Sequence, residues 1–163
     1  MNGHEISDYK RKIMKKLIDD ETIFELINYD GSAEYPDDML YKNIFPYNRI
    51  PETEQEESVY VCVMIDIPTI YARNNIARNV NIRLRVYSHE RLMQVKGQSG
   101  DRIDLVSARI DELLNEKFDF GIGFVSLGSN TEHVLDSRHF YREMIFKTES
   151  LNSKRDGVHQ WEH

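Results

Sequence analysis

The amino-acid sequence predicts an α+β domain with a mainly antiparallel sheet and helices packed on one face, in the order α-α-β-β-α-β-β. Apolar residues recur at helical spacing near the N-terminus and again over residues 101–116. Residues 59–67 and 80–87 instead alternate with the period of two that is typical of strands. Hairpin-linked strands with one crossing helix define the α+β class.

The chain of 163 residues has the length and composition of one ordinary domain, with 40% hydrophobic and 30% charged residues. We expect a single domain over residues 1–150 and a polar, flexible tail over residues 151–163. No apolar run approaches the roughly 20 residues that span a bilayer, and the first residues are polar and acidic. These features predict a cytosolic protein without membrane contact.

Two short helices are expected to open the chain. The first has an apolar stripe and a face rich in lysine, with Ser7 or Asp8 as its cap, and a second runs over residues 23–27. Residues 29–52 form an irregular excursion, with a turn at Tyr35-Pro36 and one helical turn within residues 39–44. The excursion has too many large side chains for a free loop, so it packs on its own domain, which we favour, or on a neighbour.

The two central strands are expected to form a long hairpin whose tip lies at residues 72–79. In the second strand, Val80, Ile82, Leu84 and Val86 alternate with polar residues and Tyr87. One sheet face should therefore be core, while the other carries arginines and is solvated or meets an acidic partner or DNA. Cys62, the single cysteine, is interpreted as a small buried hydrophobe.

A strong third helix follows, with Asp101 at its cap and Arg102 and Arg109 on its exposed face. After it we expect a short strand over residues 124–127, a turn at residues 128–130 and a last strand over residues 139–148.

Charge is distributed unevenly along the chain. The formal net charge of −7 argues against broad electrostatic binding of DNA. Residues 10–16 carry five basic side chains, whereas residues 19–57 carry twelve acidic side chains against only Lys42 and Arg49. Either subunits meet with opposite charges facing each other, or this is an uneven solvated surface.

No motif in the sequence indicates catalysis. The glycines at residues 121–123 lack the helix that a phosphate-binding loop requires, and they are better explained by tight backbone geometry. His133 and His139 have only Asp136 nearby as a third metal ligand. We therefore expect no catalytic residues, no cofactor and no bound metal.

A metal-dependent nuclease is the alternative from a different class. Such an enzyme needs carboxylates to hold Mg²⁺. Asp66 on a central strand could serve with Asp101 or Asp104 at a helix start. A solvated position for Asp66 and a capping role for Asp101 explain these residues without chemistry.

Four segments carry a resemblance to a known family. They are Asn-Ile-Phe-Pro-Tyr at residues 43–47, Ile50-Pro51, Ser-Gly-Asp-Arg-Ile-Asp at residues 99–104, and Tyr-Arg-Glu-Met-Ile-Phe at residues 141–146. With the two long strands, they make residues 6–150 similar to the small neck proteins of tailed bacteriophages, of the tail-terminator or head-tail joining kind. The similarity is one of pattern and order, without a signature motif.

The resemblance implies a structural virion protein, assembled in the host cytoplasm, that forms a hexameric ring. Such a ring caps the tail tube and joins it to the head-tail connector, with DNA passing through its lumen, or it serves a contractile phage-tail-like bacteriocin. A head-side connector protein, of the stopper or adaptor kind, is the near alternative. Because projecting loops reach a neighbour most readily, we expect the subunit interface to include Tyr41, Phe45, Tyr47, Arg73, Arg78, Arg83, Arg85, Arg91 and Met93.

Overall fold

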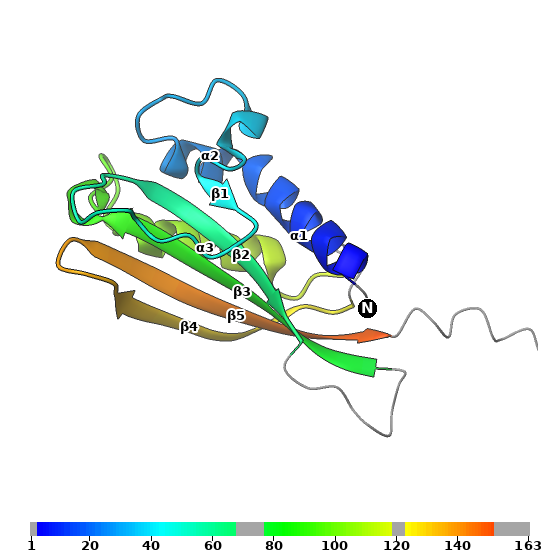
Figure 1. The fold of residues 1–163 in the computed structure, drawn as a ribbon. Helices are drawn as coiled ribbons and strands as arrows, with labels where there is room; N and C mark the ends of the chain where they lie inside the picture. The colour runs from blue at the N-terminus through cyan, green and yellow to red at the C-terminus, as the bar shows by residue number, and fades with distance from the viewer. Residues whose placement is uncertain (1–2, 68–76, 119–122, 152–163) are drawn as a thin grey trace, which may run out of the picture.

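The computed structural model describes residues 3–67, 77–118 and 123–151, and within them it confirms the α+β class. The helices lie on one face of a five-stranded sheet (Figure 1). Their bounds are α1 (Gly3–Ile18), α2 (Glu21–Ile27) and α3 (Arg102–Leu114), with short 3-10 turns η1 (Pro36–Met39) and η2 (Glu90–Leu92). The strands are β1 (Ile44–Phe45), β2 (Val59–Asp66), β3 (Ala77–His89), β4 (Ser126–Val134) and β5 (His139–Leu151).

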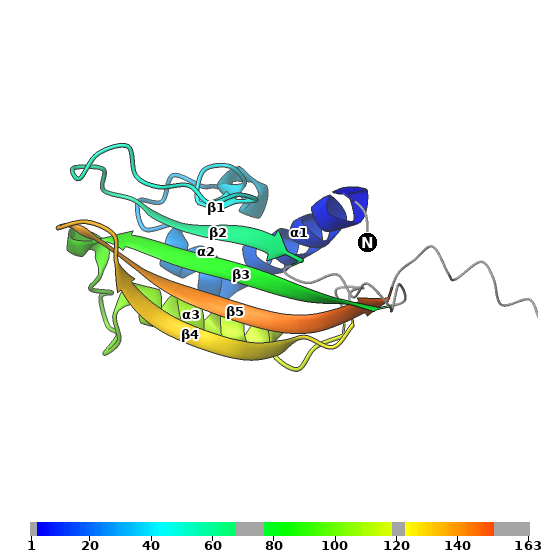
Figure 2. The same cartoon turned by 60° about the horizontal axis from the view of Figure 1, so that its bottom comes forward.

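The sheet has the strand order β1-β2-β3-β5-β4 (Figure 2). The predicted pairing of the two central strands is confirmed, because β2 runs antiparallel to β3 from Val59 opposite Ser88 to Asp66 opposite Asn81. β3 then pairs with β5 along the full length of both strands. The two-residue strand β1, which the sequence did not reveal, lies parallel to β2 at the edge. Every other pair is antiparallel, as expected.

The main core lies between the sheet and the helices. The alternating residues predicted for the core face of β3 are buried and pack with the apolar stripe of α3, including Ile103, Val106 and Ile110. Ile13 and Leu17 of α1 are fully buried in the same cluster. The apolar residues that recur every 3.6 positions in the helices and every second position in the strands thus pack together in one apolar layer.

The opposite face of the sheet is only partly as predicted. β3 does carry arginines there, but Tyr60, Cys62 and Met64 of β2 are buried on this outer face. They form a second cluster with Phe45 and Tyr87. β2 is therefore buried on both sides, and the outer face of the sheet is not simply solvated.

Several predicted boundaries differ from the structure. α1 begins at Gly3, so Ser7 and Asp8 lie inside the helix and do not cap it. The 3-10 turn η1 covers Pro36–Met39 and shares only Met39 with the helical turn predicted within residues 39–44. Asp101 does occupy the capping position of α3, yet its side chain makes no capping hydrogen bond.

The predicted turn at residues 128–130 is wrong. These residues lie within β4, where the register shifts between Leu127 and Ser129. Gly128 has no Cβ, and one built there would lie 3.2 Å from the carbonyl oxygen of Ile145. This glycine therefore permits close approach of two strands at a bulge, and the chain reverses only after Val134.

Arg102 was expected on the exposed face of α3, but it is buried. Its Nε donates a hydrogen bond to the carbonyl oxygen of Leu92 at 2.6 Å, and Nη1 donates to the carbonyl oxygen of Leu26. Leu26 belongs to the last turn of α2, whose carbonyls have no partner within the helix. Arg102 therefore fastens the start of α3 to the end of α2 and to the end of η2.

Replacing Arg102 with Met keeps much of its aliphatic volume but removes both hydrogen bonds. Two carbonyl groups then lose their donor, so we expect the free energy of unfolding to fall by about 2–4 kcal/mol. Urea denaturation followed by circular dichroism measures this change. The exposed control Lys12→Met should alter stability by less than about 0.5 kcal/mol, and an equally small effect at Arg102 would contradict the proposed fastening.

Candidate assembly interface

A row of aromatic rings crosses the outer face of the sheet. The register sets Tyr60 opposite Tyr87, Tyr87 opposite Tyr141, and His133 opposite Tyr141. Adjacent ring centroids in these pairs lie 4.8–4.9 Å apart, and Phe45 extends the row from β1 with its centroid 5.7 Å from that of Tyr60. Because the rings come from five strands, the row is continuous in space although no part of it is a motif in the sequence.

Two arginines lie over this row. The Arg49 guanidinium lies 4.8 Å from the centroid of Tyr60, and that of Arg85 lies 5.0 Å from the centroid of Tyr141. Arg49 also makes a bidentate ion pair with Glu56, while Arg85 bonds Glu143 at 2.6 Å. Each cation is thus held by a carboxylate and an aromatic face.

Aromatic rings thus lie between the arginines of this face. The aromatics come from neighbouring strands, which the sequence alone does not align. Arg83, the other arginine predicted on this face, ion-pairs with Asp66 at 3.3 Å. Arg83 and Arg85 are therefore neutralised within the domain, and neither is an unpaired cation available to a nucleic-acid backbone.

Residues 46–58 cover the outer cluster. The backbone N–H of Arg49 donates to Sγ of Cys62 at 3.3 Å, and the Tyr87 hydroxyl donates to Oδ1 of Asn48 at 2.9 Å. Cys62 is buried, as predicted, and burial raises the pKa of its thiol to about 11. The thiol is consequently protonated near neutral pH and is not a nucleophile.

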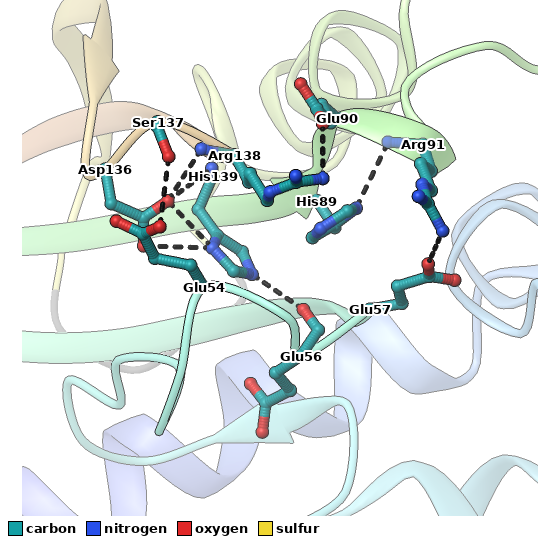
Figure 3. A network of polar contacts seen from close by, with 10 residues as sticks. All are labelled: Glu54, Glu56, Glu57, His89, Glu90, Arg91, Asp136, Ser137, Arg138 and His139. Carbon is teal, nitrogen blue, oxygen red and sulfur yellow. Dashed lines mark hydrogen bonds and ion pairs between the residues drawn. The ribbon is translucent and has the colours of Figure 1, made fainter.

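One end of this covering segment is fastened by a polar network (Figure 3). His139 is fully buried, with Nδ1 3.0 Å from the Asp136 carboxylate and Nε2 2.7 Å from the carbonyl oxygen of Glu56. The two ring nitrogens thus each face an acceptor oxygen. His139 therefore joins the turn between β4 and β5 to the loop before β2.

The carboxylates of the network favour their ionised form. Burial opposes ionisation of Asp136, but the Arg138 backbone N–H and the His139 ring donate hydrogen bonds and lower its pKa. At Glu56 burial again acts in the opposite direction, yet hydrogen bonds from Arg49 and Ser58 lower the pKa. Surrounding ion pairs join Glu57 to Arg91 and Glu90 to Arg138.

Large exposed side chains gather in the excursion before β2. Four of its side chains are between 49% and 65% exposed, in contrast to the buried Phe45: Tyr35, Tyr41, Tyr47 and Ile50. Tyr41 has a φ of 59°, a left-handed conformation that costs a non-glycine residue roughly 1 kcal/mol. Its backbone N–H bonds the carbonyl oxygen of Ile44 at 2.9 Å, which holds the strained turn in place.

A groove runs between this excursion and α1. Tyr41 and Pro46 line one side, and Lys10, Arg11 and Lys15 of α1 line the other. Nζ of Lys10 donates to the carbonyl oxygen of Pro46 at 2.8 Å, so the two sides are joined by a direct contact. The excursion packs on its own domain, as favoured, while presenting its tyrosines outward.

The predicted interface residues fall into distinct environments. Tyr41, Tyr47 and Arg91 have exposed side chains, whereas Phe45 belongs to the outer cluster and Met93 packs partly buried against the main core. The Ala72–Asn79 tip is only partly described: Arg73 lies outside the described residues, and Arg78 lies in β3, where its side chain is not described. The residues of this surface that were not among the predicted interface residues are Arg49, Tyr60, Tyr87, Tyr141, His133, Lys10, Arg11 and Lys15.

The carboxylates considered for a nuclease have structural partners. Asp66 pairs with Arg83, and Asp104 bonds Nε of Arg142 at 2.7 Å. His133 contacts Thr131 and Tyr141, and His139 is engaged by Asp136. Across the part of the chain that the structure describes, no group of three or more His, Cys, Asp or Glu side chains is arranged to hold a metal ion.

Two further predictions concern residues that the structure describes only in part. Of the glycines at residues 121–123, only Gly123 is described, with a φ of 98°. Of the polar tail at residues 151–163, only Leu151 is described, where β5 ends. None of the described helices combines the length and apolar character needed to cross a bilayer.

These features define an α+β domain with a sheet covered on both faces and a strained, tyrosine-bearing surface beside a basic helix. The family model for YomW matches residues 20–148, and the chain belongs to this family. No curated protein matches.

Among solved structures, the chain is similar to one from the virion of a native gene transfer agent particle. The TM-score is 0.54 at 11% sequence identity, over 85% of this chain and 91% of that chain. At this identity the likeness establishes a shared fold.

The outer cluster contains two tyrosines whose hydroxyls differ in bonding. The Tyr87 hydroxyl bonds Asn48 and accepts from Arg85 at 3.3 Å, whereas the buried Tyr60 hydroxyl has no hydrogen-bond partner among the described residues. We expect Tyr87→Phe to cost about 1–2 kcal/mol and Tyr60→Phe to be neutral or stabilising. Urea denaturation of both variants tests this order, and a larger cost at Tyr60 would contradict it.

Proposed function

We propose that this protein is a structural subunit of a phage-like virion, specifically a tail-terminator ring subunit that caps the tail tube and joins it to the head-tail connector. The observation that carries the proposal is the fold shared with a gene transfer agent virion protein, which extends over most of both chains. An entire shared domain is stronger support than a shared motif, although folds alone do not define function. The specific place in the neck comes from the family resemblance of the sequence.

The surface supports a role in assembly. A protein that exposes Tyr41 and Tyr47 together, with ring centroids 6.5 Å apart, presents the residue type that is enriched in protein interfaces. We place the ring contact, and contacts with the tail tube and connector, on the exposed members of the predicted interface.

The proposal is tested by the native mass of the purified protein and by its binding to isolated tail tubes. We expect a hexamer in multi-angle light scattering, or a monomer that forms a ring when tubes are added, with rings at tube ends in electron micrographs. Binding to a portal-side connector but not to tubes would favour a head-side stopper or adaptor. A monomer that ignores both partners and cleaves DNA with Mg²⁺ would replace the proposal with the nuclease alternative.

Tyr41→Gly separates assembly from stability. Glycine adopts the left-handed conformation without the steric cost, so the free energy of unfolding should stay unchanged or rise by up to about 1 kcal/mol. Loss of the exposed ring should nevertheless weaken assembly, measured as the fraction of multimer on a sizing column.

Glu116→Gly is the matched control for this variant. Glu116 is exposed and has a φ of 58°, but it follows α3 and is not one of the predicted interface residues. It should show the same stability effect while assembling like the unmodified protein. Equal assembly by Tyr41→Gly and Glu116→Gly would remove Tyr41 from the interface.

A further inference from the structure

The groove beside α1 has an apolar floor, and its α1 side is basic. Met14, Ile18 and Leu40 line it together with Pro46, the cations of Arg11 and Lys15 lie at its edge, and Asp37 is the acidic residue of the lining. The side chains of Arg11 and Lys15 are 76% and 68% exposed; Arg11 pairs with Asp8 of the same helix, and Lys15 pairs with Asp19, which directly follows it. Such exposed pairs contribute little and are readily exchanged for other partners.

The loop before β2 has the complementary chemistry. Ile50 is 57% exposed and is followed by Pro51 and by the exposed acidic residues Glu52 and Glu54. The network of Figure 3 holds this loop to the domain through His139, and Ser137 donates to Glu54 at 3.2 Å. An apolar side chain followed by carboxylates is thus presented on a backbone that is already ordered, which lowers the entropic cost of binding.

The loop begins beside the groove and extends away from it. Pro46, the first residue after β1, lines the groove, whereas the tip of the loop between β1 and β2 reaches the left end in Figures 1 and 2, away from α1. Glu54 lies in this distant part, because it accepts a hydrogen bond from Ser137 in the turn between β4 and β5. The acidic part of the loop is therefore directed toward a neighbour.

We propose that the loop of residues 50–54 of one copy binds in the α1 groove of a second copy, with Ile50 on the apolar floor and Glu52 and Glu54 against Arg11 and Lys15. This inference rests on the proposed function in that it assumes copies of the chain assemble. The contact joins two different surfaces, so it is heterologous and repeats from copy to copy, closing into a ring when the rotation permits.

The dimensions are compatible with this contact. The lining residues of α1 run from Ser7 to Ile18, a span of about 17 Å at 1.5 Å per residue. Five extended residues span at most about 17 Å. Residues 52–55 bend and turn, with the Glu56 N–H bonded to the Thr53 carbonyl oxygen at 3.2 Å, so the loop is shorter than this limit and fits within the length of the groove.

Reversal of charge on each surface tests the proposal. One variant, Arg11→Glu with Lys15→Glu, reverses the groove, and the other, Glu52→Lys with Glu54→Lys, reverses the loop. Lys10 is left unchanged because it bonds Pro46 within the domain. Each variant alone places like charges against each other, so we expect its apparent dissociation constant for self-association to rise at least about 100-fold.

The two variants should assemble again when they are mixed. The acidic groove of the first then meets the basic loop of the second, while the basic groove of the second meets the acidic loop of the first. Every contact in an alternating ring is complementary, and a chain carrying all four substitutions should likewise assemble by itself. Light scattering of the separate and mixed proteins measures these outcomes.

Matched controls change equal charge elsewhere. Lys12→Glu with Lys16→Glu alters α1 outside the groove lining, and Glu21→Lys with Glu25→Lys alters α2. Both should assemble like the unmodified protein. Circular dichroism establishes that every variant is folded, because a loss of assembly through unfolding would not be restored by mixing.

The possible outcomes separate this inference from the proposed function. If the unmodified protein forms no multimer with or without tail tubes, the ring itself is wrong. If it assembles but the reversed variants assemble equally well, or if mixing restores nothing, the groove contact is wrong and the ring stands. Rings that persist while the reversed groove abolishes binding to tubes would assign the groove to the tube protein and also overturn the contact between copies.

Discussion

Burial of β2 on both faces is the constraint on which the rest of the structure depends. A strand with Val61 and Val63 on one side and Tyr60 and Cys62 on the other needs two covers. The helices supply the inner cover, and residues 46–58 supply the outer one. The outer cover lacks regular structure, so it relies on side chains: Arg49 between Glu56 and Tyr60, and His139 beneath Glu56. This fastening also fixes the exposed acidic residues at one end of the domain, and it makes a covering loop available as a binding element.

The features predicted well from sequence are those set by local periodicity. The apolar stripes of α1 and α3 and the alternation in β3 each depend on residues a few positions apart, and the structure places them as expected. The prediction for residues 128–130 was wrong because Gly-Ser-Asn favours a turn locally, whereas pairing of eight residues of β4 with β5 outweighs that preference. The near-continuous apolar run of β2 did indicate burial on both faces of this strand. The prediction of one solvated sheet face did not take this run into account.

The candidate interface was less accessible to sequence reasoning, because its parts are assembled by long-range pairing. Tyr60, Tyr87 and Tyr141 are far apart in the chain and become neighbours only through the register of three strands. Arg102 shows the same limit. Its position on the helix is polar by pattern, but the carbonyl groups to which it donates belong to α2 and to η2. An arginine in a helix is ordinarily exposed, and only the tertiary partners of this one explain its burial.

The uneven distribution of charge along the chain has a specific consequence for association in the folded protein. A net charge of −7 makes identical subunits repel at long range, so association requires local attraction that exceeds this repulsion. Spreading both signs evenly over the surface would reduce the repulsion but would specify no orientation. In the proposed contact, basic residues on α1 and acidic residues on the loop before β2 form two different surfaces of each copy. Two copies then attract when the groove of one meets the loop of the other and repel when two acidic loops meet. A directional contact of this kind selects rings or filaments over two-fold dimers, which is the property that a subunit capping a tube needs.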